Sequence, residues 1–224
     1  WGKHLQSTSC APLSAALQDA NPHVRLQAID LLGAPCPAGE GIADEMAALA
    51  GTLSDTPRAW HAPAHALVSL ARQSPERARK VLPRFVEHQT WQVRMYAARA
   101  AGILQDTGLL ATLSADPHHN VREAALAALI ELGRPEAVGA ALEALAADDH
   151  QLVLTATRAF EDPSTAPKAV PALLASLERL TAQQKDTSRD PRMAILSRLE
   201  VLGGPAQAGA MKAYLEDFDP RVAA

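Results

Sequence analysis

Two histidines are the first candidates for chemistry in this 224-residue sequence. His61 and His65 are four residues apart, a spacing that brings two side chains to one face of a helix, where two imidazoles could hold a metal ion. No Asp, Glu or Cys stands nearby at a matching spacing. The sequence therefore predicts no metal site here, and we expect His65 to face solvent.

A second group, His118 and His119 with Asp116, stands between two helical patterns and is typical of a solvated turn. Neither a Ser/His/Asp nor a Cys/His triad can be recognised from spacing, and no Gly-rich phosphate loop is present. The sequence predicts no catalytic residue, no cofactor and no metal.

The only two cysteines, Cys10 and Cys36, stand before and after a predicted helical hairpin, with helices at about 11–19 and 22–32. Antiparallel helices would bring the two cysteines to the same end of the hairpin. A disulfide needs Cα atoms within roughly 7 Å, and this topology permits a bridge without requiring one. A bridge would indicate the periplasm or the cell exterior, and two free thiols would favour the cytoplasm. Both alternatives stay open.

An internal repeat decides the fold. The segments HVRLQAIDLLG (23–33), QVRMYAARAAG (92–102) and NVREAALAALIELG (120–133) each contain Val-Arg, an Ala four residues after the Val, and a closing Gly. Looser copies place the same register at 60, 152, 193 and 222. A helical pattern that recurs about every 30 to 45 residues predicts a solenoid.

The predicted fold is all-α: a right-handed α-α superhelix of about six helical hairpins in one domain, 1–224. Apolar residues recur at helical spacing, Ala favours close helix packing, and strand signals are absent. Asn-Pro, Ser-Pro and Asp-Pro pairs predict helix starts, and Pro83 predicts a kink or break. The expected repeats are 9–36, 42–73, 75–105, 107–133, 135–161 and 163–204, with an incomplete repeat at 205–224.

The segment VREAALAALIELG resembles the second helix of a HEAT repeat of the bacterial, lyase-type kind. The resemblance implies the solenoid fold and a ladder that pairs a turn residue with a residue six positions later. The residues that match the ladder are Asp19 with Arg25, Asp55 with His61, His88 with Arg94, and Asp116 with Arg122. The copy at 152 lacks both partners.

The composition limits the kinds of partner that this chain could bind. The net charge is −4, no Lys/Arg run is present and aromatics are 4%, which disfavours nucleic acid. No apolar stretch approaches the roughly 20 residues that span a membrane. HEAT-like hydroxylases carry His-Glu pairs, which this sequence lacks; HEAT-type enzymes that act on DNA or tetrapyrroles remain a distant alternative.

We therefore predict a non-catalytic scaffold that binds a protein or peptide on the concave face formed by the second helices. Trp91 starts one of these helices, and its side chain either anchors a partner or packs in the core. We expect the register residues of the second helices to be buried, which leaves other positions of these helices facing outward. These positions are Gln27, Asp30, Tyr96, Arg99, Glu123, Thr155 and Arg158. The alternative is an accessory HEAT region of a larger bacterial enzyme, for example one joined to a cyclophilin-like prolyl isomerase.

Both ends of the sequence suggest a piece of a longer protein. The first residue is Trp1 rather than Met, and the last residues, DPRVAA, begin a second helix that stops after about one turn. We expect the last complete helix, about 205–218, to expose part of its apolar face.

Overall fold

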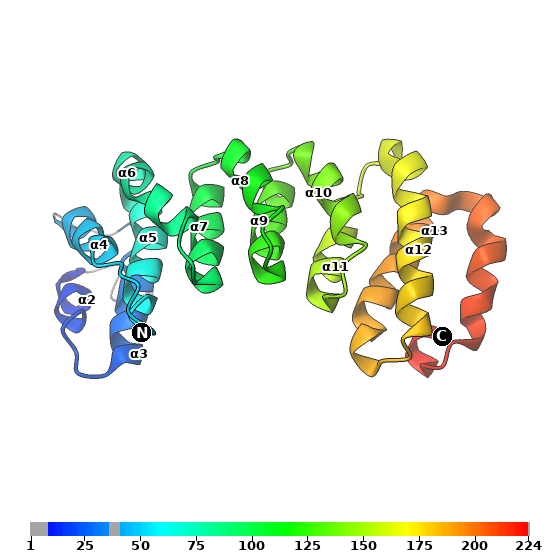
Figure 1. Cartoon of the computed structure of the whole chain (residues 1–224), viewed down its shortest axis with the longest axis horizontal. Coiled ribbons are helices and arrows are strands. Elements are labelled where there is room, and N and C mark those ends of the chain that lie inside the picture. Colours follow the sequence, from blue (N-terminus) through cyan, green and yellow to red (C-terminus); the bar gives the residue numbers. More distant parts are fainter. Residues whose placement is uncertain (1–8, 36–40, 224) are drawn as a thin grey trace. The chain divides into compact units, whose positions relative to one another are not determined.

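The computed structural model describes residues 9–35 and 41–223, and within these ranges it contains helices and no strand (Figure 1). The predicted all-α class is confirmed. The elements in chain order are α2 (Ala11–Ala16), α3 (Pro22–Leu31), α4 (Ile42–Gly51), α5 (His61–Gln73), α6 (Pro75–Val86), α7 (Trp91–Ile103), α8 (Thr107–Leu113), α9 (His119–Glu131), α10 (Glu136–Ala144), α11 (His150–Thr157), η1 (Pro163–Thr165), α12 (Ala166–Ala182), η2 (Asp186–Ser188), α13 (Arg189–Met211), η3 (Lys212–Glu216) and α14 (Pro220–Ala223).

Short polar side chains start several of these helices. The Asn21 side chain accepts a hydrogen bond from the His23 N–H at 2.9 Å, and Pro22 is the first residue of α3. Asp149 accepts from the Leu152 N–H at 2.8 Å at the start of α11. These bonds satisfy main-chain donors that have no partner inside the helix.

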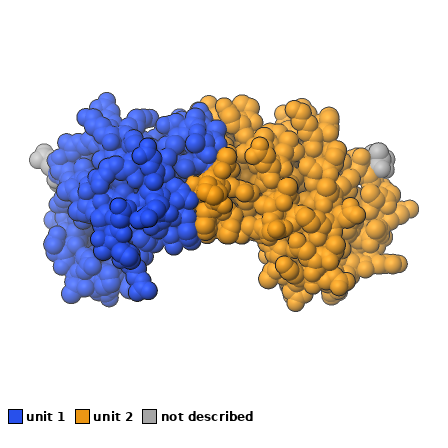
Figure 2. Space-filling model, viewed as in Figure 1, with its two compact units in different colours: residues 1–113 blue, residues 114–224 orange. Residues whose placement is uncertain are grey.

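The chain divides into two compact units, unit 1 (residues 1–113) and unit 2 (residues 114–224), which Figure 2 shows in blue and orange. Each unit is described by itself. The single domain, the count of six hairpins and the right-handed superhelix stay predictions.

In unit 1 the second helices of three successive pairs lie side by side: α5 contacts α3 on one side and α7 on the other (Figure 1). The first helices α4 and α6 pack against α5 as well. Alanines at the centre of this packing, among them Ala66 on α5 and Ala97 on α7, are fully buried. Their small side chains allow the helices to approach closely. Larger residues such as Leu67 and Phe85 fill the remaining core.

In unit 2, α11 contacts α9, α10 and α13, and α12 packs along α13. Phe160, Leu173 and Leu177 are fully buried in its core. The backbone of Gly204 is left-handed (φ 59°) and interrupts the helical conformation inside α13. Glycine adopts this conformation without the Cβ clash that other residues meet.

The expected break at Pro83 and the expected burial of two register residues were wrong, whereas a kink at Pro83 stays a prediction. The helix α6 continues through Pro83 to Val86, because proline removes a single N–H and the Glu87 N–H still bonds to the Pro83 carbonyl at 3.1 Å. The register residues Val24 and Met193 are 39% and 42% exposed rather than buried. Val24 lies on α3, and among the described second helices only α5 packs against α3.

The expected last helix, about 205–218, is built as the end of α13 and the 3-10 helix η3, and apolar side chains are exposed in and before it. Val201, Leu215 and Phe218 are 64%, 68% and 39% exposed. Across the described ranges, no helix is both long and apolar enough to cross a membrane.

Candidate binding face

Three side chains from three neighbouring helices of unit 1 form a continuous chain of hydrogen bonds. Asp30 is near the end of α3, His65 is in the first turns of α5, and Tyr96 is in the middle of α7. The Nδ1 atom of His65 lies 2.7 Å from Oδ1 of Asp30, and its Nε2 atom lies 2.6 Å from the Tyr96 hydroxyl. Because α3, α5 and α7 are adjacent, residues 31 and 35 positions apart in the sequence meet on one face.

The chemistry of the three groups fixes the direction of these bonds. An ionised carboxylate only accepts hydrogen bonds, so Nδ1 of His65 must carry a proton and donate it to Asp30. In the neutral imidazole the other nitrogen then has a lone pair, and it accepts the O–H of Tyr96. The Asp30 side chain is 46% exposed and that of His65 is 18% exposed, so the chain of bonds runs from solvent into the packed face.

Arg99, one turn beyond Tyr96 on α7, completes the set, and we call Asp30, His65, Tyr96 and Arg99 the unit 1 row. The guanidinium carbon of Arg99 lies 4.8 Å from the centre of the Tyr96 ring, within cation–π range. Arg99 is exposed. The row therefore carries a negative group at one end, a positive group at the other, and two neutral polar groups between them.

Aromatic rings flank the row. The partly buried Trp60 ring lies 6.1 Å from that of Tyr96, and it stacks on the His61 imidazole at 3.8 Å. Trp60 also packs against the core of unit 1, as expected for the register position that is a valine in the closely matching copies.

Burial is the largest influence on the Tyr96 hydroxyl and raises its pKa above 10.0. The positive charge of Arg99 lowers the pKa, Asp30 raises it, and the net shift is upward. Tyr96 is therefore a neutral phenol at physiological pH and serves as a hydrogen-bond donor to His65.

The structure brings together three of the residues predicted to contact a partner, namely Asp30, Tyr96 and Arg99. It also corrects the expectation for His65, which lies between Asp30 and Tyr96 instead of facing solvent. Sequence reasoning missed it because the acidic partner is on another helix, 35 residues away. Its position, five residues after the register residue Trp60, is the signal that could have found it.

The other predicted residues lie elsewhere. Gln27 is exposed on α3, and Trp91 is partly buried at the start of α7. In unit 2, Thr155 is only 2% exposed, and its hydroxyl donates to the Glu123 carboxylate at 2.9 Å, so the expectation that it faces outward was wrong. Arg158 is exposed, beside Glu161 and Asp162 in a shallow pocket of the same unit.

Two of the four expected ladder pairs meet through the main chain, and the pair of Asp116 with Arg122 stays a prediction. The Arg25 guanidinium donates to the Asp19 carbonyl at 2.7 Å, and Arg94 donates to the His88 carbonyl at 2.9 Å. The Asp19 carboxylate instead accepts the Asn21 N–H at 2.7 Å. The arginine therefore donates to main-chain carbonyls of the turn that precedes its helix. The side chain of the turn residue, such as Asp19, accepts a main-chain N–H of the same turn.

At two other ladder positions the turn side chain also accepts the main-chain N–H two residues later. Asp116 accepts the N–H of His118 at 2.8 Å, and the Nδ1 atom of His88 accepts the N–H of Thr90 at 3.0 Å. In the copy where histidine replaces the ladder arginine, the Nδ1 atom of His61 lies 2.9 Å from the Arg58 carbonyl.

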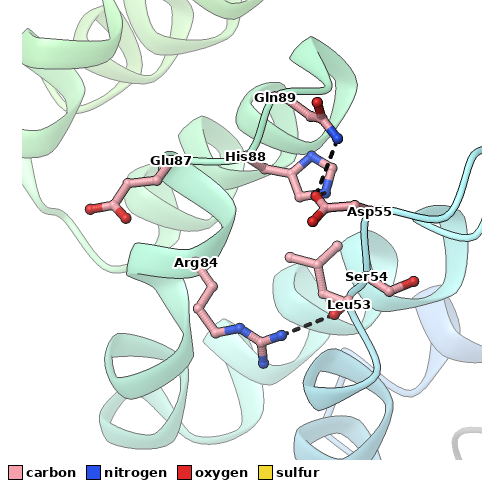
Figure 3. A pocket seen from close by; sticks show the side chains of 7 residues that line it. All are labelled: Leu53, Ser54, Asp55, Arg84, Glu87, His88 and Gln89. Carbon is pink, nitrogen blue, oxygen red and sulfur yellow. Dashed lines mark hydrogen bonds and ion pairs between the residues drawn. The ribbon is translucent and has the colours of Figure 1, made fainter.

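The turn residues Asp55 and His88 belong to neighbouring copies and meet in a pocket of unit 1 (Figure 3). The Nε2 atom of His88 lies 3.5 Å from the Asp55 carboxylate, which also accepts from the Gln89 amide at 3.3 Å. Below them Arg84 donates to the Leu53 carbonyl at 2.9 Å. The buried Nε2 atom of His88 is within ion-pair distance of the Asp55 carboxylate but forms no hydrogen bond.

The predicted turn histidines of unit 2 lie together: the rings of His118 and His119 are 4.5 Å apart, and His119 lies 3.3 Å from the Asp149 carboxylate. Among the described residues, no group of three or more His, Cys, Asp or Glu side chains is placed to hold a metal ion.

Cys10 is 3% exposed, and the described residues include no free cysteine. Cys36 lies outside the described residues, so the Cys10–Cys36 bridge stays a prediction.

No protein-family model and no curated protein matches this sequence. Among solved structures, the chain is similar to the X-ray structure of YibA from Escherichia coli, a HEAT-like repeat protein, with a TM-score of 0.62 and 18% identity over 97% of this chain and 80% of that one. It also matches two engineered proteins at 18% and 16% identity, covering 86% and 95% of this chain and 96% and 93% of theirs, with TM-scores of 0.49 and 0.47. The likeness to YibA shows the fold alone: an all-helical chain similar to a helical-repeat protein.

Proposed function

We propose that this chain is a HEAT-type scaffold that binds a peptide or protein segment on the face formed by α3, α5 and α7, with the unit 1 row at its centre. One observation carries the proposal: Asp30, His65 and Tyr96 hold one another in place across three helices by bonds of 2.7 and 2.6 Å. Side chains fixed before binding lose little conformational freedom when a partner arrives.

The residue types support a protein partner. Tyrosine, tryptophan and arginine are the residues most enriched among those that dominate binding energy at protein interfaces. Here Tyr96, Trp60 and Arg99 lie together, with the exposed carboxylate of Asp30 at the edge. A mixed pair of charges around an aromatic centre suits a polar peptide better than a polyanion.

A catalytic function is the second candidate, because carboxylate, imidazole and hydroxyl occur in the same order in hydrolytic triads. The raised pKa of Tyr96 argues against it. A nucleophile is activated by a lowered pKa or by a base that removes its proton; His65 is placed as such a base, but burial raises the pKa of Tyr96 and disfavours its phenolate. We therefore propose binding without catalysis; a role as an accessory region of a larger enzyme is compatible with this.

The test is a footprint with a peptide selected against the folded chain from a random displayed library. Side chains covered by the peptide become protected from chemical labelling, and we expect protection of Tyr96 and Arg99. Tyr214 and the exposed Lys80 on α6 are matched references on other surfaces. Protection at Lys80 or Tyr214 with none in the unit 1 row, or a library that yields no specific binder, would contradict the proposal.

A further inference from the structure

We propose that protonation of His65 reverses the hydrogen-bonding character of Tyr96, so that the unit 1 row takes a hydrogen-bond donor from its partner near neutral pH and an acceptor when acidified. The inference deepens the proposed function and rests on it for the partner. The switch itself lies in three side chains of this chain and can be measured without one.

Near neutral pH, every proton in the row has a defined place. Nδ1 of His65 donates to Asp30 over 2.7 Å, and Nε2 accepts the Tyr96 proton over 2.6 Å. The Tyr96 oxygen then has only lone pairs left, one of which accepts from the Arg99 side chain, so the other is open to a donor that approaches from solvent. Because Arg99 already places a cation over the Tyr96 ring, the donor that fits best is uncharged, such as a main-chain N–H of the bound segment.

Histidine is the side chain that commonly gains a proton between about pH 8 and 5. An added proton can enter only at Nε2, since Nδ1 already carries one. A protonated Nε2 is a donor, and at 2.6 Å it must donate to the Tyr96 oxygen. The Tyr96 O–H then has to turn away from His65 toward solvent, where it meets an acceptor such as a main-chain carbonyl.

The charges around His65 permit this change. From α3, Asp30 faces it and stabilises the imidazolium; from α7, Tyr96 faces it with Arg99 behind, and Arg99 opposes the added charge. On its own helix, His61 is stacked on Trp60. On the other helices that pack on α5, Asp44 pairs with Arg77, Glu45 accepts from the Ser14 hydroxyl, Arg79 donates to the Leu104 carbonyl and Arg84 to the Leu53 carbonyl, and Glu76 and Lys80 are exposed.

The experiment follows the ring nitrogens of His65 by nuclear magnetic resonance in the full chain labelled with ¹⁵N-histidine. The spectrum of His65→Gln identifies the His65 signals. Near neutral pH we expect Nδ1 of His65 to carry the proton and Nε2 to be unprotonated. On acidification we expect both nitrogens to carry protons. Tyr96→Phe should keep the Nδ1–H form, because Asp30 still holds that proton, whereas Asp30→Ala should shift the population toward Nε2–H. The exposed His23 is an internal reference.

Three results would overturn the switch: a proton on Nε2 near neutral pH, a His65 ring that gains no second proton while the acidified chain stays folded, or a tautomer that Asp30→Ala leaves unchanged. Melting curves of each variant confirm that it is folded. If the nitrogens behave as expected but no peptide binds the row, the proposed function fails while the switch stands. If a peptide binds the row but Nε2 carries the proton, only the switch fails.

Discussion

The hydroxyl of Tyr96 lies 2.6 Å from Nε2 of His65, a residue that precedes it by 31 positions on the neighbouring helix. Two consecutive copies of the repeat thus share one polar contact, and Asp30 extends it to a third copy at 2.7 Å. Such a contact links the helices through partly buried groups, where each hydrogen bond contributes more than at an open surface.

Both tyrosines should ionise above the ordinary value of 10.0, because burial is the largest influence on the pKa of Tyr96 and of Tyr214 and raises both. A group whose pKa is raised by folding stabilises the protein below its unfolded pKa and loses that contribution as the pH rises through its folded pKa. Stability should therefore fall above pH 10, and Tyr96→Phe should reduce this fall. Phenolate absorbance in Tyr214→Phe isolates Tyr96; a midpoint at or below 10.0 would contradict the placement of Tyr96.

The buried ion pair of Arg192 and Asp217 should be critical for unit 2. Both side chains are fully buried, Arg192 also donates to the Ser188 hydroxyl at 3.1 Å, and its guanidinium lies 4.2 Å from the centre of the Phe218 ring. Removing one partner leaves a buried charge without its counter-ion, which typically costs about 3–5 kcal/mol. We expect Asp217→Ala to lower the free energy of unfolding by about 3 kcal/mol or more in urea denaturation.

The exposed pair of Arg77 and Asp44 is the matched control, with side chains 45% and 73% exposed. Exposed pairs contribute about 0–1 kcal/mol, so Asp44→Ala should change the stability by less than about 1 kcal/mol. A double replacement, Arg192→Met with Asp217→Leu, should cost less than Asp217→Ala because no charge remains buried. Equal losses for Asp44→Ala and Asp217→Ala would argue against the buried pair.

The turn between α6 and α7 should tolerate asparagine but not leucine at position 88. His88 accepts the N–H of Thr90 through Nδ1, as Asp19 accepts the N–H of Asn21. His88→Asn keeps an acceptor and adds no charge beside Asp55, so thermal stability should change little. His88→Leu leaves the N–H without its partner and should cost about 1–2 kcal/mol. Equal melting temperatures for the two variants would show that this bond contributes nothing.

A thiol count under denaturing, non-reducing conditions tests the bridge between Cys10 and Cys36. We expect no titratable thiol in protein isolated under oxidising conditions, and two after reduction. Because the bridge would close a loop of roughly 25 residues, its removal should cost about 3 kcal/mol. Two thiols in the oxidised protein would refute the bridge and remove the argument for an oxidising compartment.

The sequence predicted the helices because local rules set them. Asn21 and Asp149 cap α3 and α11 by contacts within three residues, and the apolar period places residues such as Val121 in the core. Pro83 shows the limit of such rules. Proline removes one main-chain hydrogen bond to the preceding turn, and the packing of α6 on α5 and α7 is set by other parts of the chain.

The candidate site could be predicted only in part, because its geometry depends on neighbouring helices. The register predicted that Asp30, Tyr96 and Arg99 share one face, but the position of His65 depends on the contacts of both α3 and α7 with α5. The same limit applies to Thr155. Its register predicts an outward side chain, and its burial comes from Glu123 on the adjacent helix α9.

The most direct test of the proposed binding face is the affinity of a selected peptide for the whole chain and for two matched pairs of variants. Tyr96→Ala and Arg99→Ala change the unit 1 row, whereas Tyr214→Ala and Lys80→Ala make the same kind of change elsewhere. We predict that Tyr96→Ala weakens binding at least about 30-fold, as expected for a residue worth about 2 kcal/mol or more at an interface. Arg99→Ala should weaken it less, and the two controls should bind as the parent does. Unchanged affinity in Tyr96→Ala and Arg99→Ala, with both variants folded, would contradict the account.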